Sequence, residues 1–272
     1  MVDNHSHNSY RIPVPEQYKS VFAHFYSAKN TENQFITQTL LPSFQTLLIF
    51  NFGDNIKIST DQNTEITVEK CLVLGPVKRG MNYTLSPGTE LLVANFIDDA
   101  FFRFFGPVLT TETLPNHPDH WLEENCFTDL WETLDKIEKP TEKVNHILDF
   151  CKPYLNKRNE IAEQLATFDN KNTDPIKSTA QKRQQSQRHI QQIHKTHFGY
   201  SAKAFARYQR FFKAVQLLQK LAQKSSQVDW FEIIDECGYY DQSQLIRDFQ
   251  HFIHLSPTQY LKCQQEICNP LS

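Results

Sequence analysis

Near its C-terminal end the chain reads GYYDQSQLIRDF (residues 238–249). In a helix that begins after Asp241, Leu245 and Phe249 lie one turn apart on the same side, so both are predicted to be buried. The opposite side carries Gln242, Ser243, Ile246 and Arg247. A helix with one anchored face and one polar, arginine-bearing face is expected to lie against a polar partner.

The same half-motif occurs twice in the C-terminal region. Adding 55 to the residue number carries Ser186 to Asp241 and Ile190 to Leu245, and before the second turn the offset falls to 54. Ser186 and Asp241 are good N-cap residues, because their side-chain oxygens accept from free amides of the first helical turn. Each copy is predicted to be a short helix, a tight turn and a second helix, with one residue more in the second turn, at Gly238.

A long helix is expected between the two copies, over residues 202–223. Ser201 is its predicted N-cap, and Gly199 is placed to end the preceding helix in the left-handed conformation. A helix of about 20 residues spans roughly 30 Å, which is close to the ~34 Å of one duplex turn. Such a helix can hold the second helix of each copy, called the reading helix from here on, in successive major grooves on one face of DNA.

The outward residues of both second helices are of types that read bases. Gln recognises adenine and Arg recognises guanine through paired hydrogen bonds, and Ser donates or accepts. Basic residues of the long helix are suited to phosphate contacts, which position a protein without reading sequence. The candidate DNA-binding residues are Gln187, Arg188, Gln191, Gln192 and Lys195 in the first unit, Gln242, Ser243, Gln244, Ile246 and Arg247 in the second, and Lys203, Arg207, Arg210 and Lys213 between them.

The charge is divided unevenly along the chain. The net charge of the 272 residues is −3, but residues 1–170 hold 14 basic and 23 acidic residues, and residues 171–272 hold 14 and 8. Residues 176–228 contain 11 Lys and Arg and no acidic residue. This pattern indicates that the C-terminal part meets a polyanion, although a solvated basic surface gives the same composition.

The segments SQRHI (186–190), FGYSAKAFAR (198–207), GYYDQSQLIRDF (238–249) and LSPTQY (255–260) resemble the DNA-binding domain of AraC/XylS-type bacterial transcription regulators. The resemblance implies two helix-turn-helix units joined by a long helix. It also implies sequence-specific binding to double-stranded promoter DNA, usually to activate transcription, with RNA polymerase as a partner. Family members carry an N-terminal domain for effector binding or dimerisation.

Several positions depart from the family pattern. They are Gln192 in place of arginine, His194 in place of an aromatic residue, Ala202 in place of proline and His254 in place of glycine. In the leading helix of the first unit, Thr179 and Gln184 stand where apolar or glycine residues are usual. The first unit is therefore expected to pack more loosely and to read bases less stringently than the second.

The N-terminal part is predicted to be β-rich, with strands at residues 46–53, 56–60, 66–76 and 90–96 separated by turn residues. A helical turn is expected over residues 98–106, helices over 121–139 and 141–155, and a polar boundary over 157–176. The resulting fold class is α+β with two domains. We expect a β-rich, cupin-like barrel for sensing or dimerisation (residues 1–112), a helical connector (113–168) and an all-α double helix-turn-helix domain (169–272).

No catalytic, cofactor or metal site is predicted. The six cysteines are scattered and indicate reduced thiols, and residues 25–116 contain no histidine for a cupin metal site. The histidine pairs, among them His194 and His197, lack a third ligand, so surface or tail histidines are expected. The run FFRFFG (101–106) is expected to be core, with a ligand pocket or a dimer seam as alternatives.

The chain is expected to be a cytoplasmic DNA-binding regulator rather than an enzyme. It has no apolar run long enough to cross a bilayer and no secretory signal at its start. The rival interpretation is a small-ligand-binding protein or enzyme whose helical region is a protein-interaction module, and a lesser one is a sequence-unselective DNA compactor. The promoter, the direction of regulation, a small-molecule effector and a homodimer are left open by the sequence.

Overall fold

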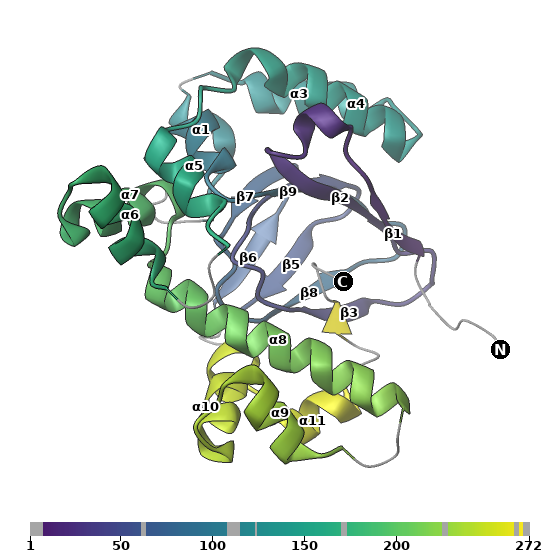
Figure 1. The fold of residues 1–272 in the computed structure, drawn as a ribbon. Helices are drawn as coiled ribbons and strands as arrows, with labels where there is room; N and C mark the ends of the chain where they lie inside the picture. Colours follow the sequence, from purple (N-terminus) through teal and green to yellow (C-terminus); the bar gives the residue numbers. More distant parts are fainter. Residues whose placement is uncertain are drawn as a thin grey trace.

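The computed structural model describes residues 8–60, 64–107, 115–122, 124–169, 173–224, 228–263 and 267–268. A β-rich N-terminal domain with helices on one side packs against a helical C-terminal domain (Figure 1). The long helix α8 (Ala202–Lys224) runs along the junction, with α6 and α7 at its start and with α10, α9 and α11 following one another along its length (Figure 1). The two-domain α+β organisation is as predicted.

The strands that the structure describes form two five-stranded sheets. The first has the order β1-β2-β9-β4-β7 and the second β10-β3-β8-β5-β6, and all named pairs are antiparallel except β10 with β3. The strands are β1 (Asn8–Ile12), β2 (Phe22–Lys29), β3 (Ile36–Leu40), β4 (Thr46–Phe52), β5 (Ile56–Ser59), β6 (Glu65–Val68), β7 (Cys71–Leu74), β8 (Met81–Leu85), β9 (Glu90–Phe96) and β10 (Ile267–Cys268).

Strand β4 shows why the first sheet is apolar on both faces. Side chains alternate along a strand, so Leu48 and Phe50 pack in one core with the helices. Leu47 and Ile49 pack in a second core between the two sheets. All seven residues of the strand are therefore buried.

The β-rich region differs from the expected barrel, because the strands in its described residues remain in two separate sheets and do not close into a barrel. The stretch 66–76, expected as one strand, is two strands: β6 lies in the second sheet and β7 in the first. After β7 the chain turns at Gly75, whose φ of +121° suits only glycine, and an added Cβ would lie 2.8 Å from the Gln45 carbonyl oxygen. Strands β1, β2, β3 and β8 were not predicted.

A helical layer covers the outer face of the first sheet (Figure 1). The predicted helical turn is α1 (Ala100–Phe105), and the two predicted helices are α3 (Cys126–Asp135) and α4 (Pro140–Cys151). Phe101 is buried in this core as expected, and Phe104 and Phe105 pack against it. Those two rings also border a cavity of about 220 Å³ shared with Cys126 and Cys151, so the run contributes both core and pocket lining.

The C-terminal helices follow the predicted repeat. They are α5 (Glu160–Ala166), which packs onto this domain, α6 (Pro175–Arg183), α7 (Gln187–Phe198), α8, α9 (Trp230–Cys237), α10 (Gln242–Ile253) and α11 (Pro257–Lys262). The last helix ends at Lys262, and Ile267–Cys268 forms a short strand that pairs with β3. The predicted domain limits 112 and 168 stay predictions.

The turns of the two units correspond in a way that the sequence obscures. Gly199 and His254, 55 residues apart, both end a reading helix in the left-handed conformation, with φ of +75° and +57°. Gln184 and Gly238, 54 apart, do the same for the leading helices, with φ of +54° and +72°. Each pair contains one glycine and one residue that is strained there. The backbone repeat is thus closer than the residue identities indicate.

Phe44, in the segment between β3 and β4, joins the two domains. Its ring stacks on Tyr208 of α8 at 4.5 Å between centroids and meets the edge of Tyr200 at 5.0 Å. Phe44 belongs to the core of the C-terminal domain although the chain places it in the β-rich part. Its φ of +57° is unusual for a phenylalanine, and the surrounding aromatic rings hold it there. The domains therefore share apolar packing.

Candidate nucleic-acid interface

Helix α10 presents the polar face that the sequence predicts. Asp241 accepts a hydrogen bond from the Gln244 amide at 2.7 Å and caps the helix. Leu245 and Phe249 are buried beneath it. The exposed residues of its first two turns are Gln242, Ser243, Ile246 and Arg247. Gln244 differs from these four, because it is half-buried and its side-chain oxygen accepts from the Tyr240 amide.

Helix α7 has the same construction. Ser186 accepts from the His189 amide and caps the helix, and Ile190 is fully buried. The predicted contact residues Gln187, Arg188, Gln191, Gln192 and Lys195 are all exposed, and so is His189. Gln192 donates to the Thr196 hydroxyl at 3.3 Å, a weak contact that leaves its amide oxygen on the surface. The tips of both reading helices thus lie outside the protein interior.

The basic residues of α8 are of two kinds. Lys203 is exposed. Arg207 and Arg210 are instead bound to Asp248 of α10, a carboxylate of which only 2% is exposed, at 2.7 and 3.0 Å. Lys213 donates to the carbonyl oxygen of Glu236 at the end of α9. The two arginines and Lys213 therefore hold the second unit against α8, and their contact with phosphate stays a prediction.

Both reading helices flank one strip of α8. A cleft beside α7 is lined by Gln191 and Lys195 together with Lys203 and Ala206 of α8. A second cleft, beside α10, is lined by Gln244 and by the same Lys203 and Ala206. Because Lys203 and Ala206 line both clefts, α7 and α10 stand on either side of a common surface.

Two exposed aromatic residues at the second unit were not predicted as surface features. Tyr240, in the turn before α10, has 92% of its surface exposed, and Phe231, in the first turn of α9, has 81%. Together with Gln242 they line an open hollow beside the exposed N-terminal end of α10. The tandem tyrosines 239 and 240 are the sequence signal for an exposed ring in this turn. Tyr239 is buried, and its neighbour Tyr240 points outward.

His194 corrects one expectation. It was predicted to be a surface histidine, but it is buried, its ring stacks on Phe198 and its Nδ1 lies 2.9 Å from the Tyr200 carbonyl oxygen. Burial lowers its pKa, while the bond to the Tyr200 carbonyl acts in the opposite direction. A neutral imidazole thus occupies a core position of the first unit.

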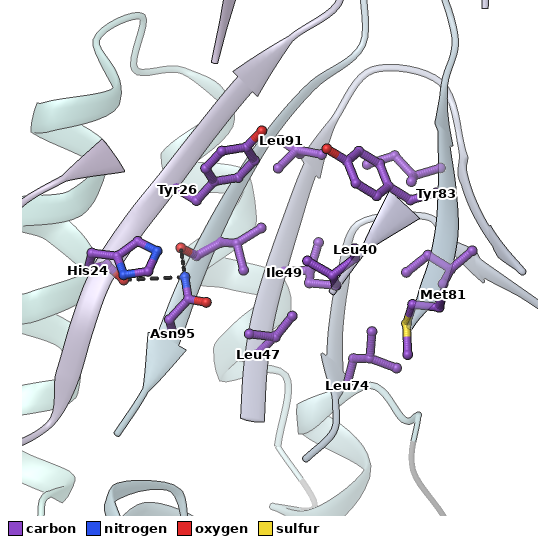
Figure 2. Close-up of a pocket in the computed structure, with 13 residues that line it drawn as sticks. His24, Tyr26, Leu40, Leu47, Ile49, Leu74, Met81, Tyr83, Leu91 and Asn95 are labelled. Carbon is purple, nitrogen blue, oxygen red and sulfur yellow. Dashed lines mark hydrogen bonds between the residues drawn. The ribbon is translucent and has the colours of Figure 1, made fainter. Parts of the chain in front are cut away.

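The β-rich domain contains an apolar cavity between its two sheets, with a volume of about 60 Å³ (Figure 2). Leucine, isoleucine and valine side chains form most of its wall, and Met81 and Tyr83 of β8 close one side. His24 of β2 and Asn95 of β9 bring the polar atoms. Asn95 donates to the carbonyl oxygens of His24 and Val93, both at 3.4 Å.

His24 has a ring nitrogen that needs a partner. Its Nε2 is buried and makes no hydrogen bond with any residue that the structure describes. Burial lowers its pKa to about 4, and the charge of Arg11 acts in the same direction. His24 lies immediately before the histidine-free range of residues 25–116 and was not predicted as a site residue. A neutral His24 can donate to, or accept from, a polar group placed in the cavity.

The described residues contain no group of three or more His, Cys, Asp or Glu side chains placed to hold a metal ion. The five cysteines whose side chains are described are free thiols. No helix within the described ranges is long and apolar enough to cross a membrane.

Comparison with known proteins places the C-terminal region. Residues 179–262 match the protein-family model described as "Helix-turn-helix domain", and no curated protein matches the chain. Among solved structures, ToxT from Vibrio cholerae is similar, with 12% identity, a TM-score of 0.43 and coverage of 94% of this chain and 97% of that one. ToxT with an unsaturated fatty acid bound has 11% identity, a TM-score of 0.40 and 96% coverage of both chains. An RmlC-like cupin protein from Desulfovibrio desulfuricans has 14% identity, a TM-score of 0.27 and coverage of 35% and 87%.

Proposed function

Because the C-terminal region carries a helix-turn-helix domain of the AraC type, we propose that this protein is a sequence-specific transcription regulator that inserts α7 and α10 into successive major grooves of promoter DNA. Base contacts come from Gln242, Ser243 and Arg247 of α10 and from Arg188, Gln191 and Gln192 of α7. Lys203 contacts phosphate. The pairing of polar, exposed tips with buried anchors on both helices supports this assignment.

One observation carries the proposal. Both reading helices border the same strip of α8, at Lys203 and Ala206. Two helices that flanked opposite sides of α8 would not reach one duplex, whatever their side chains. A common strip lets a single DNA segment meet both units, with the basic side chain of Lys203 near its backbone.

The test is selection of bound fragments from a random DNA library, followed by gel-shift titration of the selected site against random competitor. We expect a single enriched site with two half-sites one helical turn apart and a specific-to-random affinity ratio of about 10³ or more. Binding without enrichment would make the protein an unselective DNA compactor. Absence of binding would favour the interaction-module interpretation.

We also propose that the cavity between the sheets is the place of a small apolar effector that bonds to His24 Nε2. The wall is almost wholly apolar, and the orphan nitrogen supplies one polar anchor, which is the usual pattern of a ligand pocket. A cavity of about 60 Å³ is smaller than the ~150 Å³ that admits benzene, so the sheets must separate for a ligand to bind. Native mass spectrometry of the purified protein, before and after organic extraction, tests for a retained molecule.

The chain is not proposed to be an enzyme. Regulation needs only binding, and the helix-turn-helix match supports a regulator. The proposed partners are promoter DNA and RNA polymerase, with a homodimer as the assembly to be tested by light scattering. Activation or repression follows from where the selected site lies relative to a promoter.

A further inference from the structure

The connection between β7 and β8 carries two basic residues, Lys78 and Arg79, into the junction of the domains. It is held rigidly at both ends. The Val77 carbonyl oxygen accepts from the backbone amides of Ser43 and Phe44 at 3.0 Å, and the Val77 amide donates to the backbone carbonyl oxygen of Gln45. The Gly80 amide donates to the Phe252 carbonyl of α10 at 2.6 Å. The two basic side chains between these anchors are exposed.

These side chains line the same cleft as the DNA-binding helices. The cleft beside α10, with a volume of about 800 Å³, is bordered by Lys78 and Arg79 from the β-rich domain and by Lys203, Arg207 and Arg210 from α8. No acidic side chain is among its lining residues. Asp248 beneath it offsets one of the two α8 arginines. Five basic side chains therefore line one concave surface, with the carboxylate of Asp248 beneath two of them.

The connection also lies between the two reading helices. Burial lowers the pKa of Lys78 most, and the nearby charge of Lys195 of α7 lowers it further. On the other side, His251 of α10 has a pKa lowered by burial, then by Arg207 and then by Arg79. Lys78 is thus near one reading helix and Arg79 near the other. Mutual repulsion of this kind is relieved when a polyanion binds.

The packing between the two domains fixes the position of the connection between β7 and β8. Phe44, two residues before the start of β4, lies within the aromatic core of the C-terminal domain, against Tyr208 and Phe252. The amide of the same Phe44 binds Val77. The segment that fastens the domains together therefore also fixes the connection that carries Lys78 and Arg79.

We propose that Lys78 and Arg79 contact the DNA backbone between the two major-groove segments, so that the β-rich domain forms part of the DNA-binding surface. This inference rests on the proposed function. Between two major-groove segments one turn apart, the minor groove and the phosphates that flank it face the protein. Phosphates are neutralised by Lys and Arg without reading sequence. The basic side chains of the cleft lie at that level, between α7 and α10.

The experiment measures DNA affinity of the full-length protein as a function of salt for the wild type and the double variant Lys78→Ala/Arg79→Ala. Each lost phosphate contact lowers the slope of log K against log salt by about 0.9. We expect the double variant to lose about two such contacts on both selected and random DNA, with an unchanged ratio between them. The charge-preserving variant Lys78→Arg/Arg79→Lys should keep the wild-type slope.

Lys57→Ala is the matched control, because Lys57 is an exposed lysine of the same domain that pairs with Glu65 and does not line the cleft. A double variant whose slope equals that of Lys57→Ala would overturn the inference, and so would a gain in affinity, which would mean that the connection obstructs DNA. Saturable thermal stabilisation by inorganic pyrophosphate with an unchanged DNA slope would make the cleft a small-anion site and would also overturn it. Failure of the wild type to select any site would instead overturn the proposed function.

Discussion

Arg207 Nε of α8 lies 2.7 Å from Asp248 Oδ1 of α10, an ion pair that ties the linking helix to the second reading helix. Arg210 binds the other oxygen of the same carboxylate and places its guanidinium 4.8 Å from the centre of the Tyr239 ring. The orientation of α10 is therefore set from α8. Asp248, which is buried, thereby helps to fix the position of Arg247 and Gln242 on the surface.

Asp248→Asn is expected to lower the free energy of unfolding by about 1.5–3 kcal/mol, the range for hydrogen bonds to charged groups. Both arginines are partly exposed, so solvent screening places the effect at the lower end. Chemical denaturation measures it. Asp235→Asn, at an exposed position of α9, is the control and should change stability by less than about 0.5 kcal/mol. Equal stability of the two variants would contradict a structural role for the pair.

Arg247→Ala is expected to relax discrimination at one base pair and to cost about 1–3 kcal/mol on the selected site. In the free protein its guanidinium bonds only weakly to the Ser243 carbonyl, at 3.2 Å, and is available to a guanine. Lys203→Ala, which removes an exposed charge, should weaken all sequences alike and reduce the salt slope by about one. Competition titrations on single-base variants of the site separate these outcomes. Equal losses on specific and random DNA would reduce Arg247 to a phosphate contact.

Gln184→Gly is expected to stabilise the protein by about 0.5–1 kcal/mol, because the left-handed φ of +54° at this helix end strains any residue with a Cβ. The midpoint of thermal unfolding should rise by a few degrees. Gln185→Gly, one residue later and outside the left-handed region, should show no gain. If both glycine variants lose stability equally, the strain at position 184 is absent in solution.

Val93→Ile is expected to fill part of the cavity between the sheets, which Val93 lines. One added methylene gains about 0.8 kcal/mol when it is buried without clash. Val73→Ile makes the same change at a fully buried position outside that cavity, where overpacking should cost about 1–3 kcal/mol. Calorimetry of both variants tests whether the space is empty. A destabilised Val93→Ile would show that the cavity is closed in solution.

Stability should decrease as the pH falls below 6.5, in part through His194. Its folded pKa is lowered by burial, so the unfolded chain binds the proton first. The contribution is complete above the unfolded pKa of about 6.5 and is lost as the pH falls toward the lower folded value. His194→Phe keeps a ring at this site and should flatten the pH dependence of the unfolding midpoint. Parallel profiles for the two proteins would contradict the buried, neutral state of His194.

The double helix-turn-helix was readable from the sequence because its signals are local. N-cap residues, a four-residue spacing of buried side chains and polar residues on the other face act within one helix, and Ser186, Leu245 and Phe249 behave as predicted. Charge composition is likewise a property of the chain alone. These features determine the helices of the C-terminal domain, their two faces and the negative charge of the expected partner.

Tertiary structure decided what depends on segments far apart in the chain. Strands β6 and β7 entered different sheets because pairing partners lie at β5 and β4, which no local pattern specifies. Arg207 and Arg210, basic residues on an exposed-looking helix, were bound by Asp248, 41 and 38 residues away. Phe44 packs in the core of the C-terminal domain, and its hydrogen bond to Val77 places the neighbouring Lys78 and Arg79 at the cleft. Contacts of this kind follow from packing and long-range ion pairing, so only the folded chain reveals them.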